Sequence, residues 1–129
     1  MSARFLTSLK LEKVGPDRWR LLDKLLYRSV KYAGIFVVPA GFETDLTSIP
    51  APLQSLIHKV DRYDAASVLH DAAYTHQLQT ASGRPVYTTK TVADALFHEA
   101  VRASGTGRVK AAVMYAAVKL WGDPEGRRA

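Results

Sequence analysis

One histidine and two aspartates stand out in this chain because they lie among alanines and aliphatic residues. His70 and Asp71 are adjacent in the segment Asp64–Tyr74, and Asp94 lies in the segment Val92–Phe97. A carboxylate buried in such surroundings needs a partner, and a histidine on a packed neighbouring helix is a suitable one. The pattern therefore predicts a contact between His70 and Asp94.

A histidine paired with an aspartate can act as a general base in hydrolysis. The imidazole takes a proton from water through one ring nitrogen, while the carboxylate on the other nitrogen fixes the tautomer and stabilises the imidazolium that forms. His70 is the expected base, and Asp94 is the expected orienting carboxylate. Tyr74 follows His70 by four residues, so the two side chains are expected on one helix face.

Asp71 lies one position round the helix from His70, so it points elsewhere and can hold a cation. A carboxylate suits a hard cation such as Ca²⁺, and backbone carbonyls of a nearby loop can complete its oxygen ligands. Such a cation polarises an ester carbonyl and stabilises the oxyanion. The alternative is zinc bound by His70, Asp71 and His98, since His98 follows Asp94 by four residues.

The elements that position these side chains divide into a β-rich part and a helical part. From residue 8 to residue 45, short runs of alternating apolar and polar residues are separated by turn residues. The expected strands centre on 8–14, 19–21, 25–30 and 35–38. We expect an antiparallel β-meander, with one face packed and the other facing water.

The part from residue 52 to residue 121 has the apolar spacing of helices. A short helical turn is expected at 53–58, and three helices follow: one from Asp61 or Asp64 with Asp64 as N-cap, one from Thr89 or Thr91, and one over 108–121. Residues 79–85 are expected as a loop and the tail 122–129 as frayed. The predicted class is α+β: a single domain over residues 1–129, with the β-meander followed by a three-helix unit carrying the His–Asp site.

Composition limits the function less than the motifs do. The 129 residues are 47% apolar and 23% charged, as in one ordinary globular domain, and the absence of cysteine excludes disulfides and thiolate metal sites. The net charge of +6 is modest enough to serve solubility alone, so nucleic acid is not an expected partner. No apolar run approaches the roughly 20 residues that span a bilayer. Residues 1–10 contain no apolar h-region, so we expect neither a transmembrane segment nor a signal peptide.

The two helical segments resemble the catalytic core of phospholipase A2, above all the cysteine-free versions in parvovirus capsid proteins. The string YDAASVLHDAAYTHQL is followed by a loop and by ADALFHEAV, which is similar to their order of HDxxY, loop and a helix opening on alanine–aspartate. The resemblance covers about residues 64–101. It implies that His70 is the general base, Asp71 a calcium ligand, Tyr74 a member of the hydrogen-bond network and Asp94 the carboxylate that orients the histidine.

One part of the phospholipase pattern is missing. The glycine-rich calcium loop, tyrosine-x-glycine-x-glycine, is absent, and its nearest counterpart is Pro39–Asp45, farther upstream of the His–Asp pair than is usual. Gly41 and Asp45 of this segment are the further calcium ligands that we expect. Asp45 equally suits a cap for the turn before Pro50.

A second resemblance covers more of the chain, from about Gly34 to Gly122. The segments GFETDLTSIP, HDAAY and ADALFHEAVRASG, followed by a helix ending in tryptophan–glycine, look like those of an uncharacterised family of small phage and prophage proteins. This resemblance implies a phage genome and a place in the virion or its tail. It implies no established activity.

The leading hypothesis is a phage-encoded, calcium-dependent hydrolase similar to phospholipase A2, acting on phospholipid esters of the host envelope. An alternative from a different class is a non-enzymatic protein of the phage tail or baseplate, which binds other virion proteins and uses its His–Asp–Tyr group as a polar staple between helices. A third hypothesis is a zinc-dependent hydrolase of peptidoglycan or nucleic acid. The expected locations are the cytoplasm of the infected bacterium and the virion tail.

Overall fold

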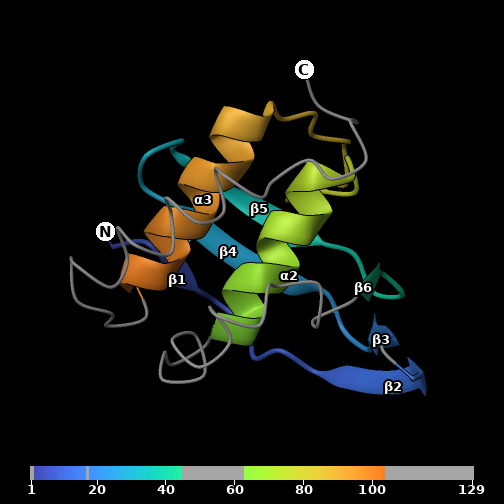
Figure 1. Cartoon of the computed structure of the whole chain (residues 1–129). Helices are drawn as coiled ribbons and strands as arrows, with labels where there is room; N and C mark the ends of the chain where they lie inside the picture. Colours follow the sequence, from blue (N-terminus) through green and yellow to red (C-terminus); the bar gives the residue numbers. More distant parts are fainter. Residues whose placement is uncertain (1, 17, 45–62, 104–129) are drawn as a thin grey trace.

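Two helices lie side by side across one face of a four-stranded antiparallel sheet (Figure 1). The computed structural model describes residues 2–16, 18–44 and 63–103. Asp45, the helical turn predicted at 53–58, the third helix predicted at 108–121 and the tail lie outside the described residues. Within the described part, the α+β class is confirmed: the β-rich region comes first and the helices follow.

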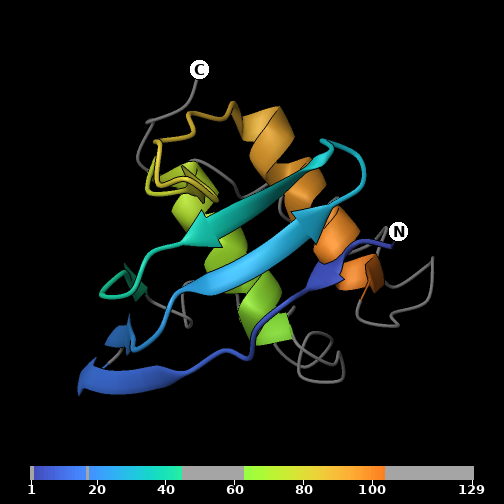
Figure 2. The same cartoon turned by 180° about the vertical axis from the view of Figure 1, so that it is seen from behind.

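The larger sheet has the strand order β1–β4–β5–β7. Its centre is the hairpin of β4 (Leu25–Ser29) and β5 (Gly34–Val38). The strand β1 (Arg4–Phe5) pairs with β4, and β7 (Gln79–Thr80) pairs with β5. Alternate residues of β4 are buried, as expected of a strand with one face packed against helices. Figure 2 shows this sheet in front of the two helices.

A smaller sheet lies on the α2 side of the molecule, away from α3 (Figure 2). It has the order β2–β3–β6, formed by β2 (Leu11–Gly15), β3 (Arg18–Leu21) and β6 (Glu43–Thr44). In its register, Trp19 faces Thr44 and Arg20 faces Glu43. This sheet therefore brings residues 43–44 beside α2.

The predicted strands are present and antiparallel, but they are divided between two sheets instead of forming one continuous meander. Backbone groups at the end of β3 form hydrogen bonds with the segments that flank it in the smaller sheet. The N–H of Leu22 donates to the carbonyl of Lys10, and the N–H of Leu21 donates to the carbonyl of Phe42. The strand β3 therefore pairs with β6 and not with β4. The prediction of a plain loop at 79–85 is wrong, because Gln79–Thr80 form β7. A strand of two residues is too short to show an alternation of apolar and polar side chains in the sequence. It is recognised only from its pairing with β5.

The helices are α2 (Tyr63–Tyr74) and α3 (Lys90–Ala103). The start of α3 agrees with the prediction: the hydroxyl of Thr89 accepts a hydrogen bond from the N–H of Val92 at 3.2 Å, as an N-cap does. The N-cap role predicted for Asp64 is wrong, because the helix already includes the residue before it. In the described part of the chain, neither helix is long and apolar enough to cross a membrane.

The end of α2 forms a Schellman motif. The N–H of Gln77 donates to the carbonyl of Ala72 at 2.8 Å, and the N–H of His76 donates to that of Ala73 at 3.4 Å. His76 has a φ of 61°, the left-handed conformation that closes such a motif. The helix therefore ends sharply one turn after His70, and the chain returns to the sheet as β7.

Small residues allow the two helices to approach closely. Alanines on both helices are buried in the core together with larger apolar side chains. The fully buried residues of the two helices include Leu69, Ala72, Ala73, Ala93, Leu96 and Ala100. Close packing of this kind leaves little freedom in the distance between the helices. Any polar side chain at the same interface is therefore held in a defined position.

Glu99 fastens α3 to the hairpin of the larger sheet. Its carboxylate accepts hydrogen bonds from the hydroxyl of Tyr27 at 2.7 Å and from the backbone N–H groups of Val30 and Lys31 at 3.2 and 2.8 Å. Burial, followed by the hydrogen bond and the charge of Glu99, raises the pKa of the Tyr27 hydroxyl well above its usual range. The contact fixes α3 on the sheet at the end opposite to Lys90.

Candidate functional site

His70 and Asp94 meet across the interface of α2 and α3. Nε2 of His70 lies 2.7 Å from Oδ1 of Asp94, so the predicted contact is confirmed. The side chain of Asp94 is 1% exposed and that of His70 is 17% exposed. A buried carboxylate therefore holds an imidazole that retains some access to solvent.

Two aromatic rings fix the orientation of the imidazole. The ring of Tyr74, one turn along α2, lies with its centroid 5.1 Å from that of His70 and tilted by 33°. The ring of Phe97, on α3, meets the imidazole edge-on at 5.5 Å and 65°. Both aromatic residues are buried. Tyr74 thus lies beside His70, as its spacing predicts. The predicted hydrogen-bond role of Tyr74 is not with Asp94, whose two oxygens contact His70 and Lys90.

Lys90 supplies the second hydrogen bond of Asp94. Its Nζ lies 2.7 Å from Oδ2 of Asp94, one turn away on the same helix. Burial by itself raises the pKa of Asp94, but the hydrogen bonds and charges of His70 and Lys90 outweigh it and hold that pKa below its ordinary value. Sequence reasoning missed Lys90, although its spacing of four residues from Asp94 was a visible signal.

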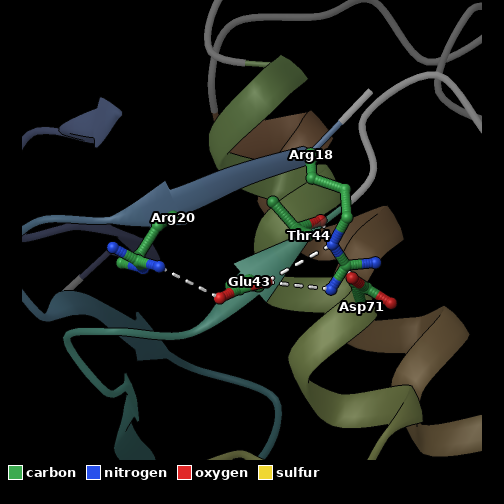
Figure 3. Close-up of polar contacts among 5 residues, drawn as sticks. All are labelled: Arg18, Arg20, Glu43, Thr44 and Asp71. Carbon is green, nitrogen blue, oxygen red and sulfur yellow. Dashed lines mark hydrogen bonds and ion pairs between the residues drawn. The ribbon is translucent and has the colours of Figure 1, made fainter. Parts of the chain in front are cut away.

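Asp71 points away from His70, toward the smaller sheet. The hydroxyl of Thr44, at the end of β6, donates a hydrogen bond to Oδ2 of Asp71 at 2.9 Å. Figure 3 shows the two side chains between β6 and α2. Thr44 is buried and Asp71 is partly buried. The two neighbours in the sequence thus serve two places: His70 faces α3 and Asp71 faces β6.

An ion-pair cluster aligns β6 with β3 just beside Asp71 (Figure 3). Arg18 donates to Oε1 of Glu43 from Nε at 3.3 Å and from Nη2 at 3.1 Å, and Arg20 donates to Oε2 at 3.4 Å. Hydrogen bonds from Arg18 and then Arg20 lower the pKa of Glu43. Exposed ion pairs contribute little stability. Their consequence here is geometric, because Glu43 precedes Thr44, the residue that contacts Asp71.

Gly41, a further predicted calcium ligand, is engaged in the turn that leads into the smaller sheet. Gly41 lies in the turn before β6 with a φ of 88°, and its N–H donates to the carbonyl of Leu21 at 2.7 Å. Gly41 therefore belongs to the contacts of the smaller sheet and forms no hydrogen bond with Asp71. Asp45 lies outside the described residues. Of the three expected ligands, the structure thus places Asp71 in the site and Gly41 in a neighbouring turn.

The zinc set of His70, Asp71 and His98 is not assembled. Among residues 2–16, 18–44 and 63–103, no three histidine, cysteine or acidic side chains are gathered as a metal site requires. His98 is partly buried on α3. Burial, followed by the charges of Arg102 and Lys31, lowers its pKa. His98 is thus a partly buried residue of α3.

Comparison with known proteins supplies a family and no function. No curated protein and no solved structure matches the chain. A family model described as "Protein of unknown function (DUF1353)" matches residues 19–118, a range that runs from the second residue of β3 past the end of α3 and includes His70, Asp71 and Asp94. An uncharacterised family is what the sequence predicted for most of this range. The chain therefore belongs to the DUF1353 family.

Proposed function

We propose that this protein is a calcium-dependent hydrolase of phospholipid esters, similar in its chemistry to phospholipase A2 and encoded by a phage or prophage. The observation that carries the proposal is the 2.7 Å contact between Nε2 of His70 and Oδ1 of Asp94 across two packed helices. The resemblance of HDAAY and ADALF to the phospholipase core supports the same assignment of roles. The phage origin is supported by the resemblance of GFETDLTSIP and its companion segments.

The pair formed by His70 and Asp94, called the dyad below, is suited to activating water. Because Asp94 occupies Nε2, the nitrogen left for catalysis is Nδ1, which has no hydrogen-bond partner among the described residues. Nδ1 takes a proton from water as the water oxygen attacks the ester carbonyl, and Asp94 stabilises the resulting imidazolium. When the ester C–O bond breaks, the imidazolium returns that proton to the leaving alkoxide. The products are a fatty acid and a lysophospholipid.

Asp71 is the proposed protein ligand of the calcium ion. Its carboxylate suits a hard cation, and Thr44 orients it away from His70, so that the cation and the base do not compete for one side chain. Asp45, the residue that follows Thr44 in the sequence, is the further proposed ligand. A bound calcium ion supplies charge for the ester carbonyl and for the oxyanion that forms from it.

The first prediction concerns hydrolysis of mixed phospholipid vesicles by the full chain in the presence of calcium. His70→Ala removes the base, so we expect hydrolysis to fall by at least about 100-fold with an unchanged circular dichroism spectrum. The matched control is His76→Asn: His76 is exposed, and asparagine tolerates its left-handed conformation. A His70→Ala protein as active as the wild type would refute the proposal.

Calcium binding is tested on the same samples by calorimetry with metal-stripped protein. Asp71→Asn removes a ligand charge, so both calcium binding and calcium-dependent hydrolysis should be lost. Asp23→Asn, which changes an exposed aspartate paired with Lys10, is the control and should keep both. Equal calcium affinity in the wild type and Asp71→Asn would contradict the ligand assignment.

A second function, that of a non-enzymatic tail or baseplate protein, is favoured by one observation. Asp94 is almost fully buried, and it joins His70 on one helix to Lys90 on the other, as a structural staple does. In that case wild-type protein neither binds calcium nor hydrolyses lipid. The same His70→Ala substitution then changes no activity, whereas the loss of a donor to Asp94 lowers the thermal midpoint of unfolding under either function.

A further inference from the structure

Lys90 contacts the dyad but takes no part in the hydrolysis described above. Its ammonium group lies 2.7 Å from Oδ2 of Asp94, while Oδ1 of the same carboxylate contacts His70. The side chain of Lys90 is 24% exposed and that of Asp94 is 1% exposed. Lys90, Asp94 and His70 thus form a continuous series of hydrogen bonds, which begins at the partly exposed ammonium group and ends at the imidazole.

Helix stability does not explain why a lysine stands at this position. Lys90 is the first residue of α3, where the helix dipole disfavours a cation, and the first turn of α3 contains no acidic residue. The order of the pair, with the cation N-terminal to the carboxylate, is also the weaker one for a pair four residues apart. The contact with Asp94 is thus a favourable interaction at a position where the helix dipole is unfavourable for a lysine.

The direction of the hydrogen bonds follows from the chemistry of the three groups. An ammonium group has donors and no acceptor, so Oδ2 of Asp94 must accept. The positive charge keeps the buried carboxyl ionised, and an ionised carboxylate only accepts, so Oδ1 must accept from Nε2 of His70. The neutral imidazole of His70 then carries its hydrogen on Nε2, and its Nδ1 presents a lone pair. A protonated Asp94 would instead donate to Nε2, and Nδ1 would carry the hydrogen.

We infer that Lys90 is a positioning residue: through Asp94 it fixes the Nε2–H tautomer of His70 and leaves Nδ1 as the proton acceptor. The catalytic meaning of this inference rests on the proposed function. The tautomer itself is a property of the folded chain and is measured without any substrate.

The test is a long-range ¹H–¹⁵N correlation spectrum of the imidazole groups in the full chain at neutral pH, with His70 assigned through its loss in His70→Gln. Wild type should show the Nε2–H tautomer. Lys90→Met should lose it in favour of the Nδ1–H form or a mixture, and Lys90→Arg should keep it because guanidinium also only donates. The matched control is Lys10→Met, which removes a lysine from the exposed pair with Asp23 and should leave His70 unchanged.

Two results overturn the inference. One is an Nδ1–H tautomer in the wild type, which is decisive even if Lys90→Met does not fold. The other is a folded Lys90→Met protein with the wild-type tautomer.

Hydrolysis is measured separately: Lys90→Met should lower kcat by about tenfold or more with KM within twofold. If the tautomer changes but the wild type hydrolyses nothing, the proposed function fails and the role of Lys90 stands. If the wild type is active and its tautomer does not depend on Lys90, the inference fails alone.

Discussion

A carboxylate as deeply buried as that of Asp94 is tolerated because two donors share its charge. His70 and Lys90 each lie 2.7 Å from one of its oxygens, so neither oxygen is left without a hydrogen bond. Removing one donor leaves the carboxylate partly unsatisfied in the core, which is strongly destabilising for a buried ion pair. The choice of variants at this site must therefore separate loss of chemistry from loss of fold.

The pH dependence of stability has a test at His98. Because its pKa is lowered from 6.5 in the folded protein, folding favours the neutral ring, so its contribution to stability is present above pH 6.5 and is lost as the pH falls through the folded pKa. We expect the free energy of unfolding to decrease below about pH 6.5, by at most about 1.4 kcal/mol per pH unit for one proton. Urea denaturation of the wild type and of His98→Gln between pH 5 and pH 7.5 measures this decrease. An equal decrease in both proteins would show that His98 is not its source.

The residues of the dyad were predictable and their surroundings were not. A charged residue within Val92–Phe97 has few explanations other than a partner, which is why Asp94 led to His70. Lys90 attracted no notice because a lysine in a polar stretch is ordinary, and only the fold shows that its ammonium group reaches into the interface. Thr44 is a similar case: a hydroxyl residue at a strand end has no pattern that predicts a contact with Asp71.

At the scale of the elements, the hairpin between β4 and β5 contains a local strain. Ala33 has a φ of 51°, which is unfavourable for a residue with a Cβ, and it is exposed, so no packing is lost on substitution. We expect Ala33→Gly to raise the free energy of unfolding by about 0.5–1 kcal/mol, measured by urea denaturation. Ala40→Gly, at an exposed alanine without a positive φ, is the control and should be neutral or destabilising. An equal gain in both variants would exclude the backbone explanation.

The elements with a clear apolar pattern were predicted best. The spacing of Leu25 and Tyr27 indicated β4, the apolar run over 35–38 indicated β5, and α3 begins between the two predicted starts, Thr89 and Thr91. The pairing of the strands was harder, because which neighbour β3 takes depends on the turn at Gly41 and on hydrogen bonds between distant segments. The end of α2 was also hidden, since His76 occupies a position where glycine is the usual signal.

At the scale of the whole molecule, the smaller sheet and the helices are joined through Thr44 and Asp71. Replacing Thr44 with valine keeps the shape but removes the hydrogen bond that orients the proposed ligand. We expect Thr44→Val to weaken calcium binding by about tenfold, since residues that orient a metal ligand commonly contribute 10- to 100-fold. Calorimetry measures the change, with Thr91→Val, at an exposed threonine of α3, as the control. Unchanged affinity in Thr44→Val would mean that the smaller sheet does not orient Asp71.

The opposite directions of His70 and Asp71 have a consequence for how such a protein can diversify. The position of the His70 imidazole depends on the packing of α2 against α3. The orientation of the Asp71 carboxylate depends instead on Thr44 of the smaller sheet, whose strands all lie within the first 44 residues. In the proposed hydrolase, substitutions in the sheet can thus alter ion selectivity while the geometry proposed for proton transfer stays as it is. Exchanging β2, β3 and β6 between relatives would then change the ion preference and leave the contact between His70 and Asp94 in place.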